Sequence, residues 1–490
     1  MKCKRILSVS LAAALLLMNA PSSALAAENI KPQQAEEASV SRVLPKEDFE
    51  AAEPAAKAVP VSGAAAEFTP SSADPYTLTA DDVNLAQCRE DDGDSNTPFI
   101  DAVMITGYKD IDLSDDRYTN IVIPETLPFE KPVLDDDGRE KKDDEGKVIT
   151  ETVVMPVIKA YRLNHANLEK LTVSKNLVYL DSFEGCSKLS EIVIPDDSQL
   201  ENFGTKTFAG TAVTQINIPS KIEKIEGGMF AGCKNLETVT FAADTKITEI
   251  GGSAFRETGL KSIELPETCA YIGEYAFQST SLEEVTFPDA LTEIGTGAFL
   301  HCLSLSKVTF GSNLMTIGDS AFNHTALEEV VIPDSVTFIG REAFSDIEAL
   351  RSITIGSGLK NLGGIARLGD LDAASRFQND VNVETIVLNE GLEKIGDSMF
   401  SWCRKVKEIV IPSTVTSIAV FAFLYNDGCN EFHVKAETPP TLEPTAFTAI
   451  GGVNTVIYVP YSEDHSILAA YLAATGWSSK GDYIQEEVEA

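Results

Sequence analysis

The sequence has few basic residues for its acidic content, and this shortage excludes two classes of partner. It contains 39 Lys and Arg against 75 Asp and Glu, which gives a formal net charge of −36. Nucleic acids and anionic membranes repel such a chain. We therefore expect no nucleic-acid partner, and a basic or neutral protein surface is the partner that the charge favours.

Long apolar runs are also scarce. After Ile6–Met18, no apolar stretch approaches the roughly 18 residues needed to span a bilayer, so we expect no membrane insertion. That first run follows three cations and precedes a small-residue cleavage site, so residues 1–26 are predicted to be a secretory signal peptide, cut before Ala27. Neither a lipoprotein anchor nor a sortase-type Leu-Pro motif is found. We expect a secreted or extracellular protein, or one associated with the cell surface.

What the chain does have is a repeat, seen clearly in Leu291–Phe310, LTEIGTGAFLHCLSLSKVTF. Each copy has an apolar pair around a glycine, then Ala-Phe, a polar turn and a Leu-x-x-Ile-x-Ile segment. The repeated phenylalanine is found at Phe183, Phe208, Phe230, Phe255, Phe277, Phe299, Phe322, Phe344, Phe400, Phe423 and Phe447. The gaps are 22 to 25 residues except for one of 56, interpreted as two periods with the second stretched by an insertion near residues 363–380. A fixed period near 23 predicts a solenoid.

The Leu-x-x-Ile-x-Ile segments predict one short strand per unit. In the unit that begins at Leu282, alternation points Leu282, Val285 and Phe287 into the core and Glu284 and Thr286 outward. A proline often follows, and it ends the strand because it cannot donate to the ladder. The predicted fold is a mainly β solenoid, with one long parallel sheet, short turns or 3-10 segments on the other side, and terminal caps.

This register resembles the leucine-rich repeats of the BspA type, over roughly residues 155–460. The resemblance implies a right-handed leucine-rich-repeat solenoid that is secreted or displayed at the cell surface, in a family where some members bind host matrix or plasma proteins. It implies no particular ligand, because the shared residues are core residues.

Five segments are predicted along the chain. They are a signal peptide at 1–26, a disordered Ala/Pro/Glu-rich linker at 27–75, an N-terminal cap at 76–154, repeats at 155–448, and a last strand with a helical cap at 449–490. Within the N-terminal cap, the charged run at residues 134–147 predicts a hairpin with a solvated tip. A calcium site is the alternative there, although Asp135, Asp137 and Gly138 do not keep the spacing of an EF-hand loop.

The eight cysteines do not suit a disulfide framework. Four of them stand three residues after the repeated phenylalanine, at Cys186, Cys233, Cys302 and Cys403. No two of these belong to adjacent units, so at least about 9.6 Å of stacking separates them, against a limit of roughly 7 Å between bridged α-carbons. Cys269 and Cys429 also replace core residues. Cys88 has no place in the repeat, which makes it the candidate for an exposed or intermolecular thiol.

Catalytic and cofactor motifs are missing. The sequence contains no Gly-x-Ser-x-Gly, no His-Glu-x-x-His, no P-loop and no dinucleotide fingerprint, so we expect no enzyme activity and no cofactor. Only five histidines are present. His165, His301 and His324 share one turn position, and the last two should stack about 5 Å apart. That pair permits metal binding, but no third ligand of fixed spacing accompanies it, and no metal site is predicted.

The outward strand positions form the default binding surface of such a solenoid. Thr and Val dominate them, as also expected if β-branched residues were kept only because they suit strands. The candidate partner-contacting residues are Glu284, Thr286, Lys307, Thr309, Glu329, Ser352 and Thr354.

Three functions follow from these features. The first is non-catalytic protein binding or adhesion, to host extracellular proteins or to the envelope of the producing cell. The second is a structural spacer or scaffold of the envelope, and the third is a metal or small-molecule module built around residues 363–380 or His301 and His324. The sequence leaves the oligomeric state open.

Overall fold

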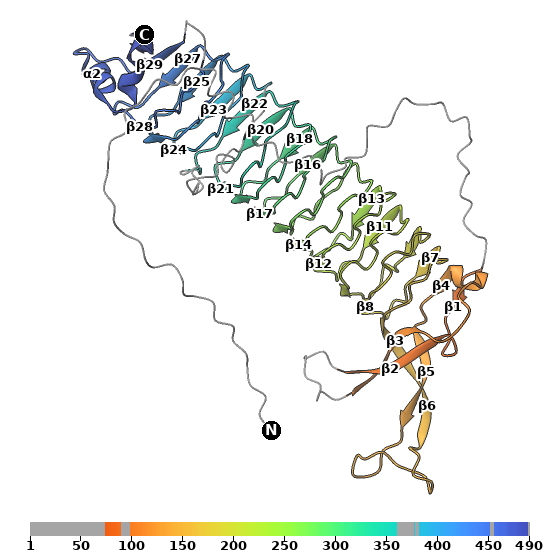
Figure 1. Cartoon of the computed structure of the whole chain (residues 1–490). Coiled ribbons are helices and arrows are strands. Elements are labelled where there is room, and N and C mark those ends of the chain that lie inside the picture. Colours follow the sequence, from red (N-terminus) through yellow and green to blue (C-terminus); the bar gives the residue numbers. More distant parts are fainter. Residues whose placement is uncertain (1–73, 90–98, 360–376, 378–381, 451–454, 489–490) are drawn as a thin grey trace, which may run out of the picture. The chain divides into compact units, whose positions relative to one another are not determined.

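The computed structural model describes residues 74–89, 99–359, 377, 382–450 and 455–488, which belong to one compact unit, Thr69–Ala490. The predicted signal peptide, almost all of the predicted linker and the insertion near 363–380, apart from Phe377, lie outside the described residues. The described part is a β-solenoid whose strands form two rows (Figure 1). This confirms the predicted parallel solenoid.

The first row, which we call the main sheet, contains one strand of two to four residues from nearly every turn, and its pairs are all parallel. Its strands pair in groups of four, two, two and seven. They are β1 (Tyr76–Thr77), β4 (Asn120–Val122), β7 (Lys170–Thr172), β9 (Glu191–Val193), β11 (Gln215–Ile218), β13 (Thr238–Phe241), β16 (Glu284–Thr286), β18 (Lys307–Thr309), β20 (Glu329–Ile332), β22 (Ser352–Ile355), β23 (Thr385–Leu388), β25 (Glu408–Ile411), β27 (Glu431–Val434), β29 (Val456–Val459) and β30 (Ile484–Glu486).

The second row was not predicted by the sequence pattern. Its repeat strands have only two residues, of which the second is buried, as in Glu293-Ile294 and Thr316-Ile317. They are β8 (Tyr179–Leu180), β10 (Asn202–Phe203), β12 (Lys224–Ile225), β14 (Glu249–Ile250), β15 (Tyr271–Ile272), β17 (Glu293–Ile294), β19 (Thr316–Ile317), β21 (Phe338–Ile339), β24 (Lys394–Ile395), β26 (Ser417–Ile418) and β28 (Thr441–Leu442). Glycines follow several of them because the backbones of successive turns touch there. A Cβ on Gly273 would lie 2.6 Å from the amide nitrogen of Gly252.

The repeated phenylalanines form a continuous column of buried rings between these rows and the turns. Neighbouring rings from Phe183 to Phe447 have centroids 5.2 to 6.0 Å apart. Phe377, which the sequence pattern did not identify as a member, stacks between Phe344 and Phe400. The interval of 56 residues therefore divides into 33 and 23, so the first of its two periods is the stretched one and not the second.

The turns around this column alternate between right- and left-handed backbone. Residues two before and two after the phenylalanine often have positive φ, including Gly297 at 58° and His301 at 60°. Because of these positive φ values, every second backbone amide in the turn points toward the next turn of the solenoid. The amides of Gly297, Phe299 and His301 thus donate to carbonyls of the next turn, at 2.8 to 3.0 Å. Backbone hydrogen bonds offset the local cost of about 1–2 kcal/mol for each left-handed residue other than glycine.

The N-terminal end is built from longer strands. β2 (Val83–Arg89) pairs antiparallel with β3 (Phe99–Tyr108), and β5 (Thr126–Pro132) pairs antiparallel with β6 (Thr150–Ala160), while β3 and β6 extend the second row. The charged run at 134–147 lies exposed at the end of the β5–β6 hairpin. A short 3-10 helix, η1 (Asp116–Thr119), precedes β4.

The predicted exposure of Cys88 is wrong. Cys88 lies in β2 and is fully buried, so it is not the exposed thiol that its place outside the repeat suggested. Its strand pairs with β3 in the sheet that extends the second row, a pairing that the repeat pattern did not predict. The six cysteines within the repeats are buried, as predicted. Burial raises the pKa of five of these thiols, those of Cys186, Cys233, Cys269, Cys302 and Cys429, for example to about 11 at Cys269.

At the C-terminal end, α2 (Ser466–Ala473) and the 3-10 helix η2 (Trp477–Tyr483) fold over the last turn. Trp477 is fully buried, packs on Phe447 at 6.0 Å, and donates from Nε1 to the Pro440 carbonyl at 2.6 Å. β30 then pairs with β29 and adds a strand to the main sheet. No helix in the described segments is long and apolar enough to cross a membrane.

Candidate functional site

The outward face of the main sheet shows the alternation that the sequence predicts. In β16, Val285 is buried while Glu284 and Thr286 are exposed. The parallel register places Glu284 beside Lys307 and Thr286 beside Thr309 in β18. The outward side chains therefore line up in two columns that run across successive strands.

The structure places the seven candidate contact residues on this face in two groups. Glu284, Thr286, Lys307 and Thr309 are exposed on the β16–β18 pair. Glu329 is exposed on β20, whereas Ser352 and Thr354 on β22 are only half-exposed. The Ser352 hydroxyl donates to the Glu329 carboxylate at 3.3 Å. The outward residues of the following strands, β23 and β25, are exposed again.

Exposed valines continue one of these columns across the following strands. Val331, Thr354 and Val387 are register partners on β20, β22 and β23. Val331 is 51% exposed, Val387 is 41% exposed, and Val410 on β25 is 37% exposed. We call Val331, Thr354, Val387 and Val410 the apolar stripe. Contiguous exposed apolar surface is one mark of protein-interaction sites.

The histidine pair lies where the sequence predicts. The ring centroids of His301 and His324 are 4.9 Å apart, on the turn side of the solenoid. Partial loss of solvation and the neighbouring His324 lower the pKa of His301. Within the described residues, a group of three possible metal ligands occurs instead at the C-terminal end of the main sheet, and it consists of Glu408, Glu431 and His433.

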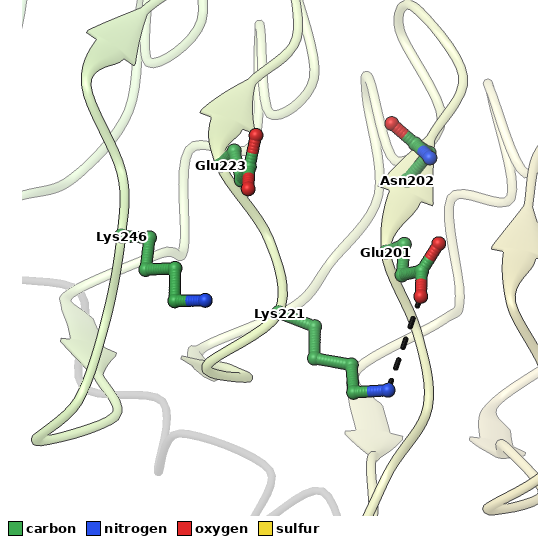
Figure 2. A pocket seen from close by; sticks show the side chains of 5 residues that line it. All are labelled: Glu201, Asn202, Lys221, Glu223 and Lys246. Carbon is green, nitrogen blue, oxygen red and sulfur yellow. Dashed lines mark ion pairs between the residues drawn. The ribbon is translucent and has the colours of Figure 1, made fainter.

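A polar hollow of about 390 Å³ lies beside the second row (Figure 2). Three successive turns contribute Glu201, Asn202, Lys221, Glu223 and Lys246, and all five are exposed. The Lys221 ammonium lies 3.9 Å from the Glu201 carboxylate and 2.6 Å from the Gln199 amide oxygen. Solvated Lys and Glu side chains of this kind are ordinary surface residues, and no sequence pattern singles them out. The hollow has the character of a solvated surface, not of an enclosed ligand site.

Comparison with known proteins finds solved leucine-rich repeat structures of low sequence identity. A search of curated proteins finds no match. Among solved structures, a leucine-rich repeat protein from Bacteroides ovatus is 18% identical, with 84% of this chain and 100% of that chain covered and a TM-score of 0.49. The pneumococcal vaccine antigen PcpA is 16% identical, with coverage of 79% and 98% and a TM-score of 0.38. A leucine-rich cell surface protein from Faecalibacterium prausnitzii is 19% identical, with coverage of 76% and 93% and a TM-score of 0.32.

The family comparison covers most of the solenoid. A model of the BspA-type leucine-rich repeat region matches in six copies, over residues 157–281, 270–366 and 373–460. These ranges include the phenylalanine column and nearly all the strands of both rows. The chain belongs to the BspA-type leucine-rich repeat family.

Proposed function

We propose that this protein is exported and binds a protein partner, without catalysis, through the outward face of its main sheet. The observation that carries the proposal is the apolar stripe, because β-branched side chains stand in register on an open face where the fold gives them no partner layer. Membership of a repeat family and the predicted signal peptide support it.

The charge of the chain favours a particular kind of partner. Beside the apolar stripe runs a polar column that includes Glu329, Ser352 and Thr385 in register. Protein interfaces commonly combine an apolar centre with a polar rim, and charge complementarity raises the association rate. A host extracellular protein or an envelope protein of the producing cell with a neutral to basic surface fits this face best.

The experiment is a pull-down with residues 27–490 against host extracellular proteins and the producer's own envelope, at low and at physiological salt. The test variant combines Thr354→Arg with Val387→Arg, which places two bulky cations on the apolar stripe. Its matched control is Thr316→Arg on β19, a half-exposed threonine of the second row. We expect at least a tenfold loss of retention in the test variant and none in the control.

Two results would contradict the proposal. If the wild-type chain retains no protein at either salt concentration, the spacer function becomes the better account. If the Thr316→Arg control loses binding as strongly as the stripe variant, the main sheet is not the binding face. Export is tested separately, by locating the full chain and a chain without residues 1–26 in culture medium, envelope and cytosol.

A further inference from the structure

Three side chains converge near the C-terminal end of the main sheet, directly beside the end of the apolar stripe, because His433 is the register partner of Val410. Glu408 projects from β25, and Glu431 and His433 project two residues apart from the neighbouring β27. The Nε2 atom of His433 lies 3.6 Å from a Glu408 oxygen and 3.5 Å from a Glu431 oxygen. One ligand atom from each residue lies within 4.8 Å of the other two.

The pairing of two glutamates at this place is unusual for the sheet. Glu408 and Glu431 are direct register partners, and like charges opposite each other destabilise a strand pair. Elsewhere on the same face a glutamate stands opposite a lysine, as in Lys170–Glu191 and Glu284–Lys307. A positive charge bound between the two carboxylates relieves this repulsion.

His433 is held in the orientation of a metal ligand. Its Nδ1 lies 3.2 Å from a Glu487 oxygen, which also accepts from the Lys435 ammonium at 2.5 Å. Its ring stacks on Tyr458 at 4.8 Å. When Nδ1–H donates to Glu487, the lone pair of Nε2 faces the two glutamates. A carboxylate behind the imidazole is the usual outer partner of a metal-bound histidine.

The distances fit a bridging ion better than direct hydrogen bonds. Hydrogen bonds from nitrogen to oxygen cluster near 2.9–3.0 Å, shorter than the Nε2 contacts to Glu408 and Glu431. Two ligand atoms held about 2.1 Å from a tetrahedral zinc ion lie about 3.4 Å apart. We propose that Glu408, Glu431 and His433 bind a divalent transition-metal ion, with Glu487 positioning the imidazole.

The ligand chemistry narrows the choice of ion. One imidazole and two carboxylates suit zinc and its first-row neighbours, whereas calcium and magnesium prefer sites made only of oxygen atoms. Three protein ligands leave a coordination position for water or for an acidic side chain of another molecule. This inference does not depend on the proposed protein-binding function.

The test measures zinc binding to residues 27–490 after treatment with EDTA, by isothermal titration calorimetry at pH 7.5, where an ordinary histidine is neutral. We expect one zinc ion per chain at this site. His433→Ala and Glu431→Gln should each weaken binding at least tenfold, and Glu487→Gln should weaken it about 10- to 100-fold through loss of imidazole orientation. Calcium at equal concentration should not displace the zinc.

Two control variants distinguish zinc binding at His433 from zinc binding elsewhere on the chain. Glu329→Gln makes the same chemical change on the same face but beside a serine, so zinc binding should be unchanged. The double variant His301→Ala with His324→Ala removes the other histidine cluster and should also leave binding unchanged. Melting temperatures in EDTA establish that each variant is folded. If His433→Ala fails to fold, His433→Gln replaces it. His433→Gln must then weaken zinc binding at least tenfold as well.

Three outcomes would overturn the proposal. The first is a wild-type chain that binds no zinc, because the three glutamates would then surround the His433 imidazole without a metal ion. The second is equal weakening by Glu329→Gln and Glu431→Gln, which would indicate diffuse attraction to an acidic surface. The third is loss of binding in the His301 and His324 double variant with normal binding in His433→Ala.

Discussion

The phenylalanine column should make the solenoid sensitive to a single substitution at its centre. Phe299 is fully buried between Phe277 and Phe322, and both centroid distances are 5.2 Å with nearly parallel rings. Phe287 meets the same ring edge-on at 5.6 Å. Replacement by alanine leaves a cavity that neighbouring rings cannot fill without breaking their own stacking.

The expected cost comes from burial and from stacking. A buried Phe→Ala change typically destabilises a protein by about 3–5 kcal/mol. Each aromatic pair contributes about 0.5–1.5 kcal/mol beyond its buried area. Phe299→Leu keeps most of the apolar volume and loses both stacked pairs, so we expect it to cost about 1–3 kcal/mol. Stability should therefore fall in the order wild type, leucine, alanine.

Native-state hydrogen exchange is the suitable assay, because a solenoid is stabilised mainly by contacts between neighbouring turns. The amides of Phe277 and Phe299 donate to carbonyls of the following turns and report on local opening. A loss of about 3 kcal/mol speeds exchange through such openings more than a hundredfold. The effect should be largest in the turns next to residue 299 and should fade toward both ends.

The control is Leu303→Ala, in the same turn. Leu303 is 71% exposed, so this truncation should change stability by less than about 0.5 kcal/mol. Equal exchange rates in Phe299→Ala and Leu303→Ala would refute the argument that the ring column holds the turns together. Faster exchange spread evenly over all turns would refute its local character.

Three further predictions concern other features of the solenoid. Gly273→Ala should lower stability by about 1–3 kcal/mol, because the new Cβ clashes with the Gly252 amide nitrogen. Gly227→Ala should not lower stability, because its Cβ lies 3.5 Å from the nearest atom, the Gly252 carbonyl oxygen. Thermal melting of both variants checks this. Hydrogen bonds from the Ser312 amide and hydroxyl lower the pKa of Asp289, so this contact stabilises the fold fully above the ordinary pKa of 3.8 and is lost as the pH falls through the lower folded value. Urea unfolding at pH 6 and pH 3 should therefore show a smaller acid effect in Asp289→Asn than in wild type. Trp477→Ala should cost about 3–5 kcal/mol and expose the last turn, seen as proteolysis that begins at the C-terminal end.

The repeat pattern predicts the core because each turn uses the same contacts. The spacing of the phenylalanines and the alternation in segments such as Leu282–Phe287 correspond to the buried column and to the main sheet. The second row escapes prediction because a two-residue strand has no periodicity of its own. Phe377 escapes when the spacing is followed forward from Phe344, because the insertion places it 33 residues later, although it lies the regular 23 residues before Phe400.

The candidate metal site shows a different limit of sequence reasoning. Glu408, Glu431 and His433 are recognisable as outward residues, because each occupies a repeat position. Glu487 is 54 residues beyond His433 and follows β30, a strand outside the repeat pattern. Only the pairing of β30 with β29 brings that carboxylate behind the imidazole. A repeat therefore predicts which residues share a face, whereas the chemistry of this face depends on a terminal strand whose register the repeat does not determine.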